Sequence, residues 1–273
     1  MNEEVTEEGA VPGRRRIVVP WFWIGLAVVA GAYLTFIVAM LVATAAYSEP
    51  GDFFQALESR EIRYSLFLSL VTCSVTGVLS LLLAVPVGYL LARGRFPGRA
   101  VLEAALDIPI VLPPMVIGLC LLILFQTGIG GLVEKVIPFT YTVFGVVLAQ
   151  FVIGAAFAVR TMRGTFENLS SRPEDVAMTL GCSRGKAVWL VTLPAAWKGM
   201  LAAASVAWAR SLGEFGPVLV FAGATRMKTE VLPTTVWLEL SVGNLESAVA
   251  VSLLMVGFAM VVLVAVRWAG EKV

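Results

Sequence analysis

Long runs without a charged residue constrain this chain more than any other feature of its sequence. Five runs lack Asp, Glu, Lys and Arg, at residues 17–47, 65–92, 108–133, 136–159 and 247–266. A helix needs about 20 apolar residues to cross the hydrocarbon core of a bilayer. A sixth segment, residues 199–225, is similar but holds Arg210 and Glu214. The sequence therefore predicts an all-α, polytopic membrane protein with six transmembrane helices.

Composition supports this fold class. Apolar residues make up 59% of the chain and charged residues 14%, and the mean hydropathy is +0.88. A soluble globular domain is nearer half apolar and one quarter charged. The first run follows three arginines at positions 14–16, as a signal peptide would. Because this run is too long for the apolar region of a signal peptide and five more spans follow, we interpret it as a retained first helix.

The distribution of basic residues predicts the orientation. With the N-terminus in the cytoplasm, the inner segments hold 14 of the 20 Lys and Arg residues and the outer segments hold five. The positive-inside rule favours this topology, in a cell membrane with both termini cytoplasmic. We expect a cytoplasmic tail at residues 1–16, a six-helix transmembrane domain at 17–267 and a C-terminal tail at 268–273.

Enzymatic chemistry is not expected. The chain contains no His, and its three cysteines, Cys73, Cys120 and Cys182, form no CxxC pair. Small buried thiols are the better interpretation of these cysteines than a metal or redox centre. There is no Gly-x-x-x-x-Gly-Lys-Ser/Thr loop to hold nucleotide phosphates. We therefore expect no catalytic site, no cofactor and no nucleic acid partner; membrane lipid is the expected surrounding.

The third span should not be straight. Pro109, Pro113 and Pro114 lie in its first turns, where proline is tolerated only near a helix start and forces a kink further in. We expect this helix to be bent or broken near its cytoplasmic end. The glycine-rich segment at residues 128–131 predicts a flexible turn.

The longest polar interruption, residues 161–198, predicts a structured cytoplasmic loop. Ser171 and Glu174 have the spacing of a capping box, which predicts a short helix that ends at Gly181 in a left-handed conformation. Ser183 can cap a second short helix that stops before Pro194. The apolar side chains of these helices need a surface to pack against. That surface is either the lipid headgroups, for an interfacial hairpin, or another protein.

Arg210 and Glu214 are the only ionisable residues inside a predicted span. At positions i and i+4 they lie on one helix face and can pair. One interpretation is a self-neutralising pair that locks the bundle or a dimer interface. The other is a gate beside a translocated anion, for which a partnered Arg offers a weak, transient site. Nearby helix-weakening residues, Gly213 and Gly216–Pro217, would suit a hinge.

One motif in the cytoplasmic loop resembles a known family. The segment EDVAMTLG at residues 174–181, followed by Leu-Pro at 193–194, is similar to the cytoplasmic EAA loop of permease subunits of binding-protein-dependent ABC importers. The match keeps Glu174, Ala177, Gly181 and Pro194. It departs at Asp175 and Val176, where the family often has Ala.

Three further segments resemble the molybdate, tungstate and sulfate branch of that family. They are WARSLGEFGP with FAG after it, LARGRFPG and DIPIVLPP, at residues 208–217, 221–223, 91–98 and 107–114. The resemblance covers roughly residues 60–267. It implies a homodimer, two cytoplasmic ATPase subunits and an extracytoplasmic substrate-binding protein.

The resemblance also implies roles for particular residues. The hairpin at 170–193 would couple the chain to the ATPase through Glu174, Asp175, Ala177, Gly181 and Pro194. The translocation path or its gate would involve Arg210, Gly213, Glu214 and Phe215. The expected cargo is a small oxyanion, molybdate or tungstate, with sulfate or thiosulfate as the alternative.

Two other classes of function remain open from the sequence. An ion-coupled secondary transporter would require several intramembrane acids or His residues and repeated broken helices, whereas this chain has one charged pair. A membrane scaffold or assembly factor would not need that pair. Co-purification with an ATPase separates the importer from both.

Overall fold

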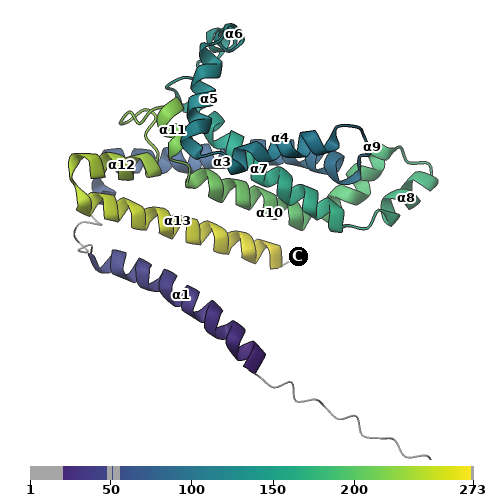
Figure 1. Ribbon diagram of the computed structural model, residues 1–273, viewed down its shortest axis with the longest axis horizontal. Coiled ribbons are helices and arrows are strands. Elements are labelled where there is room, and N and C mark those ends of the chain that lie inside the picture. The colour runs from purple at the N-terminus through teal and green to yellow at the C-terminus, as the bar shows by residue number, and fades with distance from the viewer. Residues whose placement is uncertain (1–20, 48–50, 52–55, 272–273) are drawn as a thin grey trace, which may run out of the picture. The chain divides into compact units, whose positions relative to one another are not determined.

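A computed structural model of the protein describes residues 21–47, 51 and 56–271, and every regular element in that part of the chain is a helix (Figure 1). The tail expected at residues 1–16, and residues 17–20 of the first span, lie outside the described residues. The chain divides into two compact units, residues 1–46 and 47–273. Helix α1 (Trp21–Tyr47) accounts for the described part of the first unit and is apolar on all its faces, as suits a helix surrounded by lipid.

Within the described residues, five helices are long and apolar enough to cross a membrane. They are α1, α3 (Arg60–Arg93), α7 (Val143–Asn168), the continuous helical stretch Arg184–Leu212, and α13 (Leu245–Glu271). A sixth crossing is possible if α4 (Arg99–Val111) and α5 (Pro114–Gln126) form one broken span. The all-α, six-span fold expected from the sequence is confirmed at this level. Helix α13 continues through residues 268–271, which were expected to begin the C-terminal tail.

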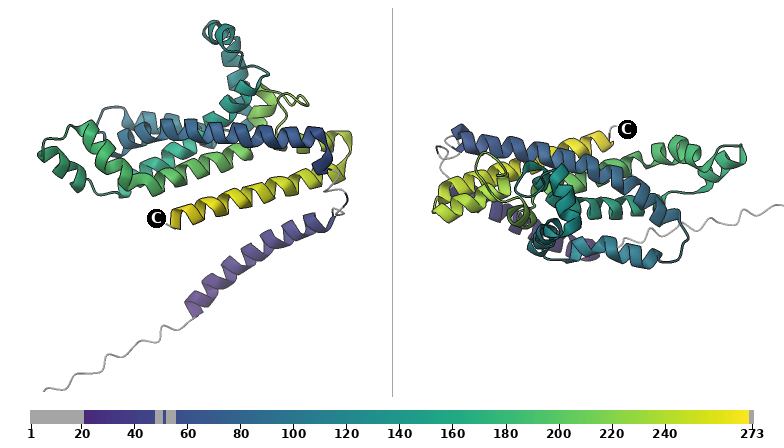
Figure 2. Two further views of the ribbon diagram at one scale, coloured as in Figure 1. Left: turned by 180° about the vertical axis from the view of Figure 1, so that it is seen from behind. Right: turned by 90° about the horizontal axis from the view of Figure 1, so that it is seen from above.

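Helices α3, α7 and α10 (Leu193–Leu212) pack together as the centre of the second unit (Figure 2). Small residues make this close approach possible. A Cβ atom at Gly88 of α3 would lie 2.8 Å from Met162 Cβ of α7, and one at Gly154 would lie 3.1 Å from Ser211 Oγ of α10. Lipid supplies no hydrophobic force between helices, so such contacts hold a membrane bundle together.

A buried amide links the same three helices. Gln150 of α7 is almost fully buried, and its Nε2 donates to the backbone oxygen of Ser211 at 3.2 Å. On the α3 side, the Thr76 hydroxyl donates to Gln150 Oε1 at 3.4 Å. A buried polar side chain with its hydrogen bonds made fixes the register of the helices that it joins.

The third span is broken, as its prolines predict. Helix α4 ends at Val111, and α5 begins at Pro114 at an angle of 112° to it. Pro113 supplies the N-cap position of α5, where its missing N–H costs no hydrogen bond. The glycine-rich turn expected at residues 128–131 is wrong, because these residues begin helix α6 (Gly128–Val136), capped by the Thr127 hydroxyl.

The predicted limits of the fourth and fifth spans also need correction. Helix α7 begins at Val143 and continues to Asn168, so the first eight residues of the expected loop 161–198 are helical. Helix α10 ends at Leu212 and is followed by α11 (Gly216–Phe221) rather than by an unbroken helix to residue 225. A further helix, α12 (Leu232–Val242), packs against α13 and was missed from the sequence.

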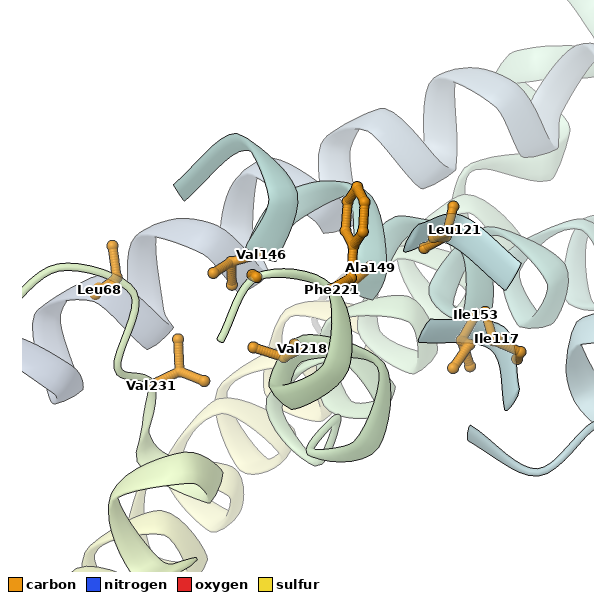
Figure 3. Close-up of a cluster of buried hydrophobic side chains, with 10 residues drawn as sticks. Leu68, Ile117, Leu121, Val146, Ala149, Ile153, Val218, Phe221 and Val231 are labelled. Atoms are coloured by element: carbon orange, nitrogen blue, oxygen red, sulfur yellow. The ribbon is translucent and has the colours of Figure 1, made fainter. Parts of the chain in front are cut away.

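A hydrophobic cluster joins the broken helices to the bundle (Figure 3). It is built from buried side chains of α3, α5, α7 and α11, including Leu68, Leu121, Val146 and Phe221. Phe221 also packs on Phe125 of α5, with ring centroids 5.2 Å apart. The short helices that follow each break are therefore held against the bundle by buried apolar surface.

The α3–α7 contact gives a direct test of the packing. Substitution G88A places a methyl group 2.8 Å from Met162 Cβ and 2.9 Å from the Arg163 nitrogen. We expect it to destabilise the folded protein by about 1–3 kcal/mol, as overpacking generally does. Thermal unfolding of the full-length protein in detergent measures the change.

The matched control is G164A, two residues from Met162 on α7, where an added Cβ meets nothing within 4 Å. Because Ala favours helix over Gly by roughly 1 kcal/mol, this variant should be as stable as the parent or more so. Equal stability of the two variants would contradict the close packing.

Candidate functional site

A helical hairpin lies at one end of the bundle, opposite the end where α12 lies (Figure 1). It consists of α8 (Arg172–Thr179), a turn at Leu180–Ser183, and α9 (Arg184–Ala187). Gly181 has a φ of 92°, in the left-handed region that the sequence predicts there. The Ser183 hydroxyl caps α9 by accepting from the Lys186 N–H at 3.4 Å, also as predicted. The turn is thus set by local residues.

The capping box predicted for α8 is wrong. The Ser171 side chain makes no capping hydrogen bond, and the Ser170 hydroxyl instead accepts from the Arg172 N–H at 3.3 Å. The Glu174 carboxylate does not reach back to the start of the helix. It points toward the bundle, where it accepts hydrogen bonds from two hydroxyl groups.

Glu174 is the contact that holds the hairpin to the transmembrane helices. Its side chain is buried; Oε1 accepts from the Tyr89 hydroxyl of α3 at 2.5 Å, and Oε2 accepts from the Thr192 hydroxyl at 2.9 Å. Hydrogen bonds to a charged acceptor are about twice as strong as neutral ones. The Tyr89 ring packs edge-on against Phe166 of α7, with centroids 5.6 Å apart. One carboxylate therefore joins α8, α3 and the start of α10.

The second helix of the hairpin does not stop before Pro194, contrary to the prediction. It continues through the π-helix η1 (Val188–Thr192) into α10, and Leu193 N–H donates to the Val188 oxygen. This wider turn lies directly before Pro194, whose ring would otherwise crowd the preceding turn of an α-helix. The hairpin and the fifth span thus form one continuous helical stretch, Arg184–Leu212.

The tip of the hairpin presents apolar side chains outward. Val176 is 56% exposed and Leu180 is 81% exposed, and Asp175 beside them is also exposed. Ala177 is half-buried, and Pro194, in the first turn of α10, is exposed. Of the five predicted coupling residues, only Glu174 is buried. The others lie on or near the hairpin surface, where a partner could contact them.

The charged pair lies at the break after α10. Arg210 Nη2 contacts Glu214 Oε1 at 2.6 Å, as the i, i+4 spacing predicts. Glu214 is 2% exposed, whereas the Arg210 side chain is 41% exposed. The Arg210 guanidinium also lies over the Phe157 ring of α7, 5.0 Å from its centroid. Glu214 lies beyond the end of α10, so the pair spans the break rather than one helix face.

The two breaks in the fold are packed against each other. A Cβ at Gly118 of α5 would lie 2.8 Å from the Pro217 Cα, and one at Gly216 would lie 3.0 Å from the Met115 nitrogen. Gly213, the predicted hinge, has a φ of −86°, and a Cβ there would make only an ordinary contact with the Arg210 oxygen at 3.8 Å, so this position has no steric need for glycine. Gly216 is the glycine that the packing requires. Phe215 packs on Trp237 of α12, with ring centroids 6.3 Å apart.

A second charged cluster, which the sequence analysis missed, lies at the end of the bundle away from the hairpin. Arg226 pairs with Glu61 at the start of α3 and with Glu239 of α12, the latter at 2.8 Å. Glu230 nearby is fully buried, and burial raises the pKa of its carboxyl group. Arg226 thereby ties α12 and its preceding loop to α3. Sequence spacing gave no signal for contacts between residues 165 positions apart.

The fold and these features define a class of protein: a polytopic α-helical membrane protein with an exposed, buttressed helical hairpin between two spans and a charged pair at a broken helix. Residues 84–273 match the family model described as the binding-protein-dependent transport system inner membrane component. The chain belongs to this family of ABC transporter permeases.

Individual relatives agree with this assignment. The chain is 36% identical to the molybdenum transport system permease protein ModB of Mycobacterium tuberculosis, over 89% of this chain and 92% of that protein. It is 35% identical to the sulfate transport system permease protein CysT of Salmonella typhimurium, over 70% and 68%. Its fold is similar to a chain of a bacterial alginate ABC transporter solved with an alginate-bound periplasmic protein. That match has a TM-score of 0.69 at 15% identity and covers 92% of this chain and 93% of the other.

The Tyr89–Glu174 contact predicts how the hairpin is held. Substitution Y89F removes one donor from the buried Glu174 carboxylate, and a buried polar group without its partner costs about 1–3 kcal/mol. We expect hydrogen exchange in residues 172–192 to become roughly tenfold faster. Exchange in α7 should not change.

Y64F is the matched control for this measurement. Tyr64 lies on the same helix, and its hydroxyl donates to the Lys228 oxygen at the other end of the bundle. This variant should leave exchange in the hairpin unchanged. If Y89F also leaves it unchanged, Glu174 does not anchor the hairpin.

The charged pair predicts an asymmetric response to substitution. R210A leaves the buried Glu214 carboxylate without its cation, whereas E214A leaves a partly exposed Arg210 that still lies over the Phe157 ring. We expect R210A to lower the free energy of unfolding by about 1–3 kcal/mol, E214A to lower it less, and the double substitution to lie nearer E214A. Thermal unfolding in detergent measures all three.

The control is R163A, which removes the cation from two partly exposed carboxylates, Glu167 at 2.8 Å and Glu103 at 3.2 Å. Exposed pairs contribute about 0–1 kcal/mol. A double substitution that is worse than R210A would contradict the pairing argument.

Proposed function

We propose that this permease forms the transmembrane path of an ABC importer for a small tetrahedral oxyanion, molybdate or tungstate. The observation that carries the proposal is the exposed hairpin, buttressed by Glu174, in a chain 36% identical to a molybdenum transport permease. That similarity extends over 92% of the relative's length.

ATP hydrolysis belongs to a separate partner chain in this proposal. The sequence contains no phosphate-binding glycine loop of the Walker type. The hairpin of each permease subunit docks to one cytoplasmic ATPase subunit. The homodimer therefore binds two copies of the ATPase. Exposed Val176 and Leu180 at its tip supply the apolar contact. Because η1 and α10 continue from α9 without a break, a displacement of the hairpin is carried along the fifth span.

The path itself lies at a homodimer interface near the two helix breaks. Helix α5 leaves the direction of α4 at 112° and exposes apolar side chains such as Leu119 and Ile123, which a second subunit can cover. The breaks at residues 112–113 and 213–215 meet beside Arg210. Broken helices in membranes are tolerated where they are buried in protein or line a water-filled path. Half-exposed Arg210, already partnered by Glu214, offers an anion a weak and reversible contact.

The orientation follows from the charge distribution. The hairpin end carries most of the basic loops, and the positive-inside rule supports a cytoplasmic location for it and for both termini. The opposite end, with α12 and the Arg226 cluster, then faces the substrate-binding protein. The similar alginate transporter was solved with a periplasmic protein, which supports a partner of this kind.

Sulfate is the second candidate cargo, supported by the 35% identity to a sulfate permease. Sulfate, molybdate and tungstate are tetrahedral dianions that differ mainly in size. The permease contacts the anion only transiently, whereas the binding protein binds it stably. The choice among these anions is therefore expected to reside in the partner.

Reconstituted transport tests the proposal. The full-length chain, its ATPase and its binding protein are placed in vesicles, and ATP hydrolysis is measured with binding protein loaded with molybdate, tungstate or sulfate. We expect molybdate and tungstate to stimulate hydrolysis and uptake several-fold, and G181V to abolish both, because a Cβ at φ 92° strains the hairpin turn.

The control is G185A, also in the hairpin but with open space around it; it should keep full coupling. Uptake that needs no ATPase subunit would contradict the importer. If the path uses Arg210, the R210A/E214A double variant should assemble normally but take up little anion. Full uptake by this variant would leave the pair a purely structural role.

A further inference from the structure

An apolar groove runs along the outside of α3 where this helix faces the start of the fifth span. It has a volume of about 760 Å³, and its walls include Leu82, Val85, Leu90, Val188, Trp189 and Met200. The walls therefore come from α3 on one side and from η1 and α10 on the other. We call this hollow the α3–α10 groove.

The groove opens at the hairpin end onto a polar hollow of about 400 Å³. Tyr89, Arg93, Gly94 and Arg184 line both hollows, so the two are continuous. The polar hollow adds Arg95 and Arg99 to the two arginines that it shares with the groove. A long apolar slot thus ends in a cluster of guanidinium groups at the end of the transmembrane helices.

Three of these arginines have no carboxylate partner among the described residues: Arg93, Arg95 and Arg184. Arg93 donates from Nη2 to the Leu169 oxygen at 2.6 Å, and its Nε is buried without an acceptor in that part of the chain. Arg99 is neutralised by Glu103 and Glu167. Two carboxylates also line this hollow: Glu174, which is already bound by Tyr89 and Thr192, and the exposed Asp175. The four arginines outnumber them.

We propose that the α3–α10 groove binds an anionic phospholipid, with its acyl chains along the apolar walls and its phosphate against Arg93 and Arg184. The match is one of shape and charge: a hydrocarbon slot that ends in unpaired guanidinium groups at the level of the lipid headgroups. Guanidinium binds phosphate oxygens in a bidentate manner and is the side chain suited to this contact.

A second copy of the chain fits the groove less well. The loops at the hairpin end carry further basic residues, among them Arg172 and Lys198. A copy seated here would add positive charge to an already positive mouth. A phospholipid such as phosphatidylglycerol brings the complementary charge, and its acyl chains need no partner of their own in the protein.

The bound lipid would bridge two elements of the structure. Arg93 belongs to the end of α3, whereas Arg184 belongs to α9 of the hairpin and Trp189 to the π-helix η1 that follows it. The bridge lies beside the Tyr89–Glu174 contact, which joins the same two elements. Anionic lipid in the leaflet on the hairpin side therefore strengthens the link between the hairpin and the transmembrane bundle.

Fluorescence quenching by brominated lipids tests the proposal. The full-length chain is placed in phosphatidylcholine vesicles that contain increasing fractions of brominated phosphatidylglycerol or brominated phosphatidylcholine. The difference between the parent and W189F isolates the signal of Trp189. We expect phosphatidylglycerol to occupy the groove about fivefold more strongly than phosphatidylcholine, since each basic residue near the surface contributes to anionic lipid binding.

The arginines are tested by R93Q/R184Q, which should abolish the preference for phosphatidylglycerol over phosphatidylcholine. R184Q alone is the safer variant for folding, because Arg184 is exposed, and it should give an intermediate value. R93K/R184K keeps the charges and should retain most of the preference. The matched control is R63Q, at the other end of α3 and also exposed, which should leave the preference at about fivefold.

Three results would overturn the proposal. Equal quenching of Trp189 by the two lipids would show that the groove does not recognise an anionic headgroup. A preference that survives R93Q/R184Q would place the headgroup elsewhere. Quenching of Trp189 by neither lipid would mean that protein, such as a second copy of the chain, covers the groove.

Discussion

The close contact of α3 with α7 and α10 is the constraint on which the second unit depends. Gly88 and Gly154 let the backbones approach to distances at which a single methyl group would collide. In a bilayer this packing replaces the hydrophobic effect as the force between helices. Gln150 then fixes the register, because its amide bonds only when α3 and α10 are correctly aligned. The hairpin at one end and the Arg226 cluster at the other are held in place by these three helices.

The hairpin at residues 172–187 is attached to the bundle by both a side-chain contact and a continuous helix. Its turn is defined locally by Gly181 and Ser183, but its attachment to the bundle is defined by the Glu174 carboxylate, which reaches α3 and η1. The π-helix joins the hairpin to α10 without a flexible linker. The exposed tip is therefore connected to the bundle through one polar contact and one continuous helix, and the α3–α10 groove lies beside the same junction.

The two broken helices serve a different purpose. Each break leaves backbone groups free and a short helix that must be held by packing, and the structure supplies this through Gly118, Gly216 and the cluster around Phe221. The Arg210–Glu214 pair lies at this junction, with the carboxylate buried and the guanidinium partly exposed. An unbroken span would place the two charges on one regular helix face, whereas the break buries the carboxylate and leaves the guanidinium accessible.

The sequence by itself determined the class of fold, the bend after Val111, the turn at Gly181, the cap at Ser183 and the pairing of Arg210 with Glu214, because each depends on residues within a few positions of one another. It also carried the family, through motifs of fixed spacing. The sequence could not predict that the Glu174 carboxylate accepts a hydrogen bond from Tyr89 instead of forming a capping box. It also could not predict that the helix continues past Pro194, or that Arg226 forms an ion pair with Glu61. The Tyr89–Glu174 and Arg226–Glu61 contacts join residues far apart in the sequence. Burial strengthens the hydrogen bonds of Glu174 relative to a local cap in water. Only the tertiary structure decided them.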